Sequence, residues 1–215
     1  EPEKKFLLTT NPKIPTLHMI PKIQKHQMDP PFRPIVSTRN SLHESTGKFL
    51  DYHLQPFVQS GRTFLKDTTD FLNKLYSLQI TNFRNMLLCT IDVKSLYTSI
   101  PHNLGLEAME SIFLLHNMDE ALGVFLLTLM EFTLTHSYFQ WKDDCYLQLT
   151  GTSMGNCAAP SYANVFMMAY EEEHILTNPL WKEHLACYWR FIDDIFLIWN
   201  GPESLLTTLI TDLNL

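Results

Sequence analysis

The sequence contains few cysteines, and they lie far from one another. Four cysteines occur among 215 residues, at positions 89, 145, 157 and 187, and no two form a CxxC pair. This spacing favours neither a structural zinc site nor a disulfide framework, so a reducing, intracellular compartment fits the chain best. The nine histidines show no metal-ligand spacing either.

Long hydrophobic runs are also missing. The longest apolar stretch, residues 121–134, contains Glu131 and is shorter than the ~20 residues that cross a bilayer. We therefore expect no membrane partner. A composition of 45% hydrophobic and 18% charged residues is typical of a folded protein with a real core. The first residue is glutamate rather than methionine, so we expect a piece of a longer protein.

Basic residues are in deficit overall, and the net charge is -7. Residues 1–66 nevertheless carry ten Lys/Arg and five Asp/Glu, a net charge of +5. Residues 67–215 carry six and eighteen, a net charge of -12. A basic first part suits contact with phosphate, and an acidic remainder suits a metal cation. An uneven spread of solvated surface charge explains the asymmetry equally well.

The pattern of prolines and apolar residues predicts the order of elements. Residues 1–36 hold seven of the twelve prolines, so we expect this segment to be extended and rich in turns rather than helical. Apolar spacing predicts a strand at 86–93, hairpins at 136–149 and 188–199, and helices at 51–58, 68–78, 104–116, 120–132, from the 151–155 loop to about 176, and from 202 onwards. The last helix should bury one side, formed by Leu205, Leu206, Leu209, Ile210 and Leu213. This order predicts an α+β fold with a split βαβ character.

Two pairs of adjacent aspartates differ in their surroundings. Asp143 and Asp144 lie at the predicted turn of the first hairpin, where solvent can hydrate both charges. Asp193 and Asp194 lie at the turn of the second hairpin, inside the run YWRFIDDIFLIW, where nearly every neighbour is large and apolar. Two adjacent anions in such a run repel each other and lose hydration, at a cost on the order of several kcal/mol if uncompensated. A bound divalent cation is the simplest compensation.

Asp92 repeats this pattern at the end of the predicted strand 86–93. If that strand neighbours the second hairpin in one sheet, three carboxylates converge on one place, as two-metal phosphoryl or nucleotidyl transfer requires. Hard oxygen ligands favour magnesium as the cofactor, with manganese as the alternative. A role of these acids as helix caps or turn residues is the other explanation.

Conspicuous blocks of sequence accompany these acids. Residues 191–194 read FIDD, residues 92–101 read DVKSLYTSIP, residues 151–155 read GTSMG, and residues 159–164 read APSYAN. Upstream, residues 21–23 read PKI and residues 33–36 read RPIV. In this order, across nearly the whole chain, the blocks resemble the reverse transcriptase domain of Penelope-like retroelements.

The resemblance implies a polymerase right hand of fingers and palm, truncated before the thumb. Residues 1–85 would form a fingers-like basic region, and residues 86–215 a palm of ferredoxin-like split βαβ topology, incomplete at its C-terminal end. The closing palm strand, the primer grip, the thumb and the endonuclease of many relatives would lie outside this sequence. The implied activity is that of an RNA-directed DNA polymerase, with an RNA template, a DNA primer and deoxynucleoside triphosphates as partners and the nucleus as location.

The resemblance also assigns roles to the acids. Asp92, Asp193 and Asp194 would be the catalytic carboxylates. Asp92 and Asp193, with the backbone carbonyl of Val93, would hold two magnesium ions, and Asp194 would complete the metal-binding cluster.

Nucleotide contacts follow from the same resemblance. Tyr97 would lie against the sugar and exclude a ribose 2′-hydroxyl, although without the family an ordinary buried tyrosine explains it. Gly155 and Pro160 belong to the loop before the helix behind the nucleotide, where glycine lets the backbone approach a base pair. Many reverse transcriptases outside this group have glutamine at the position of Met154, and methionine lacks the amide that would hydrogen-bond to the nucleotide from there.

Arg33 would contact the incoming triphosphate, because a guanidinium group binds phosphate through two parallel hydrogen bonds. Lys25 is the better spaced of two candidate lysines, and Lys22 is the other. A solvated surface lysine explains either one equally well.

Two alternatives stay open. A group II intron-like or telomerase-like enzyme would share the palm, although the DVKSLY block argues against it. A domesticated or inactive remnant would bind nucleic acid without synthesis, although the intact acids argue against decay. Arg190 would either meet the primer backbone or offset nearby acids, and the acidic run 171–173 is interpreted as a solvated helix end.

Overall fold

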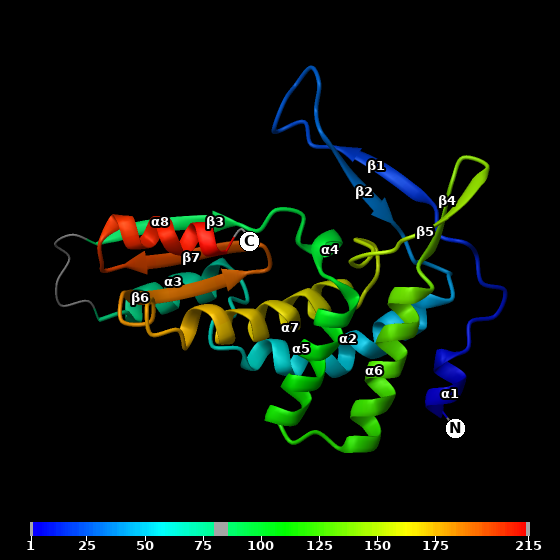
Figure 1. Cartoon of the computed structure of the whole chain (residues 1–215). Helices are drawn as coiled ribbons and strands as arrows, with labels where there is room; N and C mark the ends of the chain where they lie inside the picture. Colours follow the sequence, from blue (N-terminus) through cyan, green and yellow to red (C-terminus); the bar gives the residue numbers. More distant parts are fainter. Residues whose placement is uncertain (1, 80–85, 214–215) are drawn as a thin grey trace. The chain divides into compact units, whose positions relative to one another are not determined.

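The structure is a computed structural model that describes residues 2–79 and 86–213 (Figure 1). The chain divides into two units. The first comprises Glu1–Pro56 and Ser95–Phe166, and the second comprises Phe57–Lys94 and Met167–Leu215. Each unit contains two chain segments, because the chain crosses between the units within helix α2 (His43–Ser60), after Lys94, and within helix α7 (Ala159–Glu171). The assignment of 1–85 to fingers and 86–215 to a palm stays a prediction, and its residues 80–85 lie outside the described residues.

The first unit consists of helices and two β-hairpins. Besides parts of α2 and α7, its helices are α1 (Pro2–Leu7), α4 (Leu96–Ser99), α5 (His102–Leu115) and α6 (Glu120–Thr135). Strands β1 (Leu17–Pro21) and β2 (Phe32–Val36) form one antiparallel hairpin, and β4 (Tyr138–Trp141) and β5 (Asp144–Leu147) form the other. An isolated bridge between Thr16 and Gln140 joins the two hairpins.

The proline-rich start of the chain is partly as predicted. Residues of β1 and β2 are extended, but Pro2–Leu7 is helical, so the prediction of a segment without helix is wrong there. Pro2 occupies the first helical position, where its missing N–H costs no hydrogen bond. A proline at this position is therefore compatible with a helix.

Helices α2 and α6 supply much of the first unit's buried apolar surface. The fully or almost fully buried side chains include Leu50, Leu54, Leu126, Met130 and Leu134. Helix α6 begins where the carboxylate of Asp119 accepts a hydrogen bond from the Leu122 amide, which satisfies a free N–H of the first turn. Helices α5 and α6 pack against each other as a helical hairpin (Figure 1).

The second unit is built on a three-stranded antiparallel sheet. Strands β3 (Leu87–Asp92), β7 (Asp194–Trp199) and β6 (Leu185–Phe191) lie in the order β3-β7-β6. Helix α3 (Thr68–Ser77), a π-helical turn (Glu172–Leu176) and helix α8 (Glu203–Asp212) complete the unit. Register places Ile195 between Ile91 and Arg190, so alternate residues of the three strands share a face.

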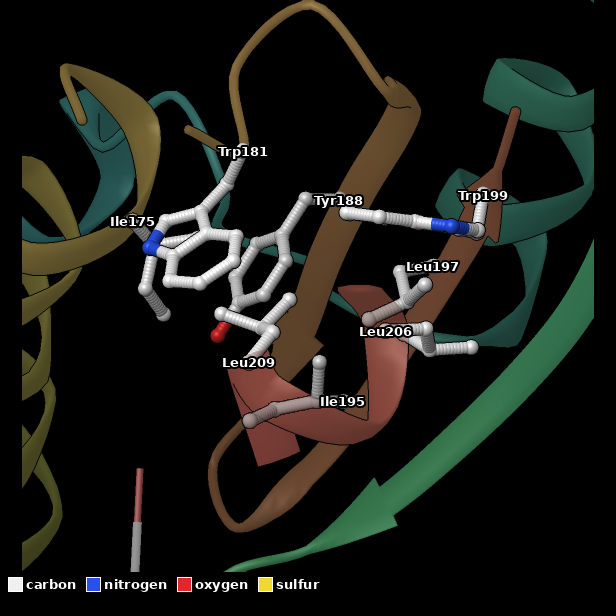
Figure 2. Close-up of a cluster of buried hydrophobic side chains, with 8 residues drawn as sticks. All are labelled: Ile175, Trp181, Tyr188, Ile195, Leu197, Trp199, Leu206 and Leu209. Atoms are coloured by element: carbon white, nitrogen blue, oxygen red, sulfur yellow. The ribbon is translucent and has the colours of Figure 1, made fainter. Parts of the chain in front are cut away.

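One face of this sheet carries the main core of the unit (Figure 2). Strand residues from β6 and β7 meet residues of α8, the π-helical turn and the segment that follows it. The buried members are Ile175, Trp181, Tyr188, Ile195, Leu197, Trp199, Leu206 and Leu209. The opposite face packs on α3, where Phe71 makes edge-on contacts with the rings of Trp189 and Phe196.

The elements predicted from residue 51 onwards occur in the predicted order, and α1, β1, β2 and α4 are present in addition. The mixture of helices and strands is confirmed, while the split βαβ palm stays a prediction. Two further details differ. Helix α2 begins at His43, well before the predicted start at residue 51. Ile210 of α8 is 37% exposed and lies outside the buried side that its spacing predicted. No helix within the described ranges 2–79 and 86–213 combines the length and hydropathy that spanning a bilayer requires.

Candidate functional site

The three predicted catalytic acids meet at one end of the sheet in the second unit. Asp92 is the last residue of β3, and Asp194 is the first residue of β7. The two are direct partners across the antiparallel pair, and Phe191 is the partner of Asp194 on the other side. Asp193 lies in the two-residue turn between β6 and β7. Convergence of the acids required the strand that ends at Asp92 to neighbour the second hairpin, and the pairing of β3 with β7 provides this.

Like charges in this cluster act on one another. Asp92 and Asp194 are exposed and Asp193 is half-buried, so water reaches the group more freely than the apolar sequence suggested. Partial burial raises the pKa of Asp194, and the negative charges of Asp193 and Asp92 raise it further. Directly opposed like charges destabilise an antiparallel pair, and a bound cation would relieve that repulsion.

Backbone contacts fix the acid-bearing turn. The Val93 amide donates a hydrogen bond to the carbonyl of Asp193 at 2.9 Å, which ties the turn to the end of β3. Ile192, the first residue of the turn, has φ +57. Glycine or asparagine normally occupies such a position, and a β-branched residue there is strained.

The acids do not by themselves surround an ion. Within the described part of the chain, no group of three or more His, Cys, Asp or Glu side chains is placed so that it could hold one metal ion. The cluster thus supplies hard oxygen donors and negative charge, and further ligands would have to come from backbone, water or substrate.

Arg190 and Glu171 form a buried ion pair beside this turn. Their side chains are 1% and 0% exposed, and Nε of Arg190 donates to Oε1 of Glu171 at 2.6 Å. The interpretation of residues 171–173 as a solvated helix end is therefore wrong for Glu171, while Glu172 and Glu173 are exposed. Arg190 was expected either to meet the primer backbone or to offset nearby acids, and its ion pair with Glu171 is the second of these two roles. An arginine inside an apolar strand indicates that a carboxylate is buried beside it, but the sequence does not indicate which carboxylate.

The predicted nucleotide-binding residues lie in the first unit. Gly151 has φ +66, and a side chain there would overlap the backbone of Tyr97 and Thr98. The Thr152 amide donates to the Tyr97 carbonyl at 2.6 Å. The GTSMG block thus packs directly on the block that contains Tyr97, whose side chain is half-buried.

Gly155 joins the same loop to the RPIV block. A Cβ atom at Gly155 would overlap the Val36 carbonyl, and the Thr38 hydroxyl donates to the Gly155 carbonyl at 3.0 Å. Pro160 lies in the first turn of α7, where its carbonyl accepts a hydrogen bond from the buried Asn164 side chain at 2.9 Å. Glycine is needed at position 155 because the backbone of the loop touches the backbone at Val36 there.

The predicted triphosphate contacts lie on the β1–β2 hairpin. Arg33 is in β2, opposite Ile20, and its side chain is exposed. Lys25 is exposed in the connection between the strands, where its amide donates to the Lys22 carbonyl at 2.9 Å. By contrast, Asp143 and Asp144 are exposed at the β4–β5 turn, as the interpretation of a solvated hairpin turn predicted.

Comparison with known proteins gives a likeness of fold. No family model and no curated protein sequence matches the chain. Apo telomerase from Candida tropicalis matches with a TM-score of 0.70 at 12% identity, over 94% of this chain and 41% of that one. Telomerase from Candida albicans in complex with a TWJ fragment of telomeric RNA gives a TM-score of 0.68 at 12% identity, over 93% and 40%. An apo telomerase from Candida tropicalis truncated from its C-terminal domain gives 0.62 at 13% identity, over 95% and 48%.

The chain has a reverse transcriptase-like fold. It spans less than half the length of each of these telomerases. Identities of 12% to 13% show the fold alone, so the likeness does not choose between a telomerase-like and a Penelope-like origin.

Proposed function

We propose that the chain carries the polymerase core of a reverse transcriptase, which adds deoxynucleotides to a primer 3′-hydroxyl on an RNA template. The observation that carries the proposal is the pairing of Asp92 with Asp194 across β3 and β7, with Asp193 in the adjacent turn. The likeness of the whole fold to telomerase supports it. In the proposed reaction the 3′-oxygen forms a bond to the α-phosphorus, and pyrophosphate leaves.

Asp92 and Asp193, with the Val93 carbonyl, are the proposed ligands of magnesium or manganese, and Asp194 completes the cluster. The donors fit because they are hard oxygens, and the raised pKa of Asp194 reflects a concentration of negative charge that a cation would offset. Magnesium commonly uses one or two carboxylates and takes its other ligands from substrate phosphates and water. Bound there, it would neutralise charge on the triphosphate and activate the attacking hydroxyl.

The remaining proposed roles are positioning and selection, since this reaction needs no covalent intermediate with the protein. Arg33 and Lys25 are the proposed contacts to the triphosphate, and their exposure on the β1–β2 hairpin leaves them accessible to a ligand. Gly155 and Pro160 are proposed to shape the loop behind the nucleotide.

Tyr97 is the proposed barrier to ribonucleotides. Its backbone is held by the Thr152 amide, so the ring starts from a fixed position. Tyr97→Ala should raise incorporation of ribonucleotides relative to deoxynucleotides by about tenfold or more, because each lost kcal/mol of discrimination changes the ratio about fivefold. Unchanged sugar selectivity in competition assays would remove this role.

A Penelope-like retroelement is the proposed source of the polymerase, and a nuclear location belongs to that proposal. Its support is the sequence blocks at 92–101, 151–155 and 159–164. A telomerase-like enzyme is the nearest alternative within polymerases. One neighbour of similar fold is a telomerase in complex with telomeric RNA, which favours RNA as a partner here.

Primer extension tests the proposal against a nucleic-acid-binding remnant. The assay uses the longest protein that contains this chain, an RNA template, a DNA primer, magnesium and deoxynucleotides. Asp193→Ala should lower extension about 100-fold or more. Asp143→Ala, which removes the matching acid from the exposed β4–β5 turn, should change it less than about twofold. Binding of primer-template without any extension by the unaltered protein would instead identify a remnant.

A further inference from the structure

The buried carboxylate of Glu171 has several donors around it. Nε and Nη2 of Arg190 donate to its two oxygens at 2.6 and 3.3 Å. The Thr63 hydroxyl donates to Oε2 at 2.7 Å, and the Tyr188 hydroxyl donates to Oε1 at 3.2 Å. Glu171 is therefore a fixed anchor, because any movement of its side chain would leave a buried charge without hydrogen bonds.

Arg190 links this anchor to the acid-bearing turn. While Nε and Nη2 bind Glu171, Nη1 donates to the backbone carbonyl of Ile192 at 3.0 Å. Ile192 immediately precedes Asp193 and carries the strained φ of +57. The rigid fork of a guanidinium group can hold a carboxylate and a carbonyl together, which a lysine cannot do in the same way.

The backbone of Arg190 is also held in place. Its amide donates to the Thr63 carbonyl at 2.7 Å, and its carbonyl accepts from the Leu65 amide at 2.9 Å. The edge of β6 is thus covered by the segment 63–65, and the guanidinium group starts from a fixed backbone position. On the far side of the turn, the Val93 amide holds the Asp193 carbonyl.

We propose that Arg190, anchored by Glu171, is a positioning residue that holds the Ile192–Asp193 turn and thereby sets the place of the catalytic carboxylates. The inference deepens the proposed polymerase function and rests on it for its consequence for activity. A strained turn persists only where its surroundings determine it, and the contact from Arg190 to the Ile192 carbonyl is such a determinant. Neither residue needs to touch substrate.

A double replacement separates positioning from stability. Arg190→Met leaves Glu171 as a lone buried charge, so that variant alone can fail to fold. Glu171→Leu with Arg190→Met replaces the ion pair by an apolar pair, which commonly restores stability. The double variant cannot restore the hydrogen bond to the Ile192 carbonyl. Arg62→Met is the matched control, because Arg62 makes an exposed ion pair with the neighbouring Glu172 at 2.9 Å.

Two measurements read the position of the turn. The first is hydrogen exchange of the Val93 amide, whose partner is the Asp193 carbonyl; it needs no activity and so decides the inference even if the protein is not a polymerase. The second is primer extension, with kcat measured separately from KM. In the double variant we expect exchange at Val93 about tenfold faster and kcat about 100-fold lower, with KM within about twofold. Arg62→Met should change none of these.

Recovery of stability together with unaltered exchange and unaltered kcat in the double variant overturns the inference, because the pair is then purely structural. Arg190→Lys gives an independent decision. It keeps the buried charge pair but loses the fork, so exchange at Val93 should rise while the melting temperature falls little. Exchange that stays at the unaltered rate in Arg190→Lys also overturns the inference. Absence of extension in the unaltered protein counts against the proposed function alone.

Discussion

Asp194 is exposed to solvent, yet its carboxyl group keeps a proton to higher pH than an ordinary aspartate does. Partial burial and the charges of Asp193 and Asp92 raise its pKa in the folded chain. In the unfolded chain Asp92 lies far away, so the pKa there is close to the ordinary value. Protonated Asp194 therefore stabilises the fold below the ordinary pKa, and this contribution is lost as pH rises through the folded-state pKa.

Asp194→Asn should consequently stabilise the protein near neutral pH. The substitution removes one of three neighbouring negative charges and keeps the shape of the side chain. Its advantage in free energy of unfolding should be smallest near about pH 4 and larger near about pH 7, measured by urea unfolding across that range. Asp143→Asn controls for the change in net charge. An advantage of Asp194→Asn that stays constant with pH would contradict this electrostatic account.

The sequence was informative about individual acids where their neighbours are apolar. Asp92 and Asp193 were recognisable because a carboxylate inside an apolar run needs an explanation. Glu171 was not, because it begins a run of three glutamates, and two of them are solvated. Its burial depends on Arg190, nineteen positions later, and no local pattern contains that distance.

Among the elements, α5 and α7 approach closely at a single glycine. Gly105 of α5 lies against the side chain of Tyr162 of α7, which is fully buried. A Cβ atom at position 105 would overlap the Tyr162 hydroxyl oxygen and the ring carbon that bears it. Gly123 of α6 has more room, since the nearest atom to an added Cβ, in the Phe113 ring, would be 3.7 Å away.

Replacing each glycine by alanine should therefore have opposite effects. Gly105→Ala should destabilise the fold by about 1–3 kcal/mol, the usual cost of overpacking. Gly123→Ala should be neutral or stabilise it by up to about 1 kcal/mol, because alanine favours a helix more than glycine does. Chemical unfolding of both variants beside the unaltered chain measures the difference. Equal changes in the free energy of unfolding at the two positions would show that the contact with Tyr162 does not determine the cost of a side chain at position 105.

Regular patterns of apolar residues predicted which helices and hairpins form better than they predicted where a helix begins or which strands pair. The β4–β5 and β6–β7 hairpins were foreseen because apolar and aromatic strands flank short turns that each contain an aspartate. The pairing of β1 with β2 was not, because prolines at positions 21 and 34 conceal the strands. The early start of α2 at His43 was also missed, since its first two turns are largely polar and carry little apolar periodicity.

For the molecule as a whole, the sequence blocks resemble those of a reverse transcriptase, and the fold is reverse transcriptase-like. The telomerase structures match over more than nine tenths of the chain at 12% to 13% identity, so the likeness lies in the fold and not in the sequence. The division into two units was not predictable, because two of the three places where the chain crosses between them lie inside the continuous helices α2 and α7. Predicted carboxylates and predicted nucleotide contacts fall in different units.

Template-directed incorporation of a single nucleotide tests the central claim most directly. The longest protein that contains this chain is given a DNA primer on an RNA template of known sequence, with magnesium and one deoxynucleotide at a time. The account predicts that only the nucleotide complementary to the next template base is added, and that Asp193→Ala abolishes the addition while Asp143→Ala does not. Addition that ignores the template, addition that persists in Asp193→Ala, or no addition of any nucleotide would contradict it.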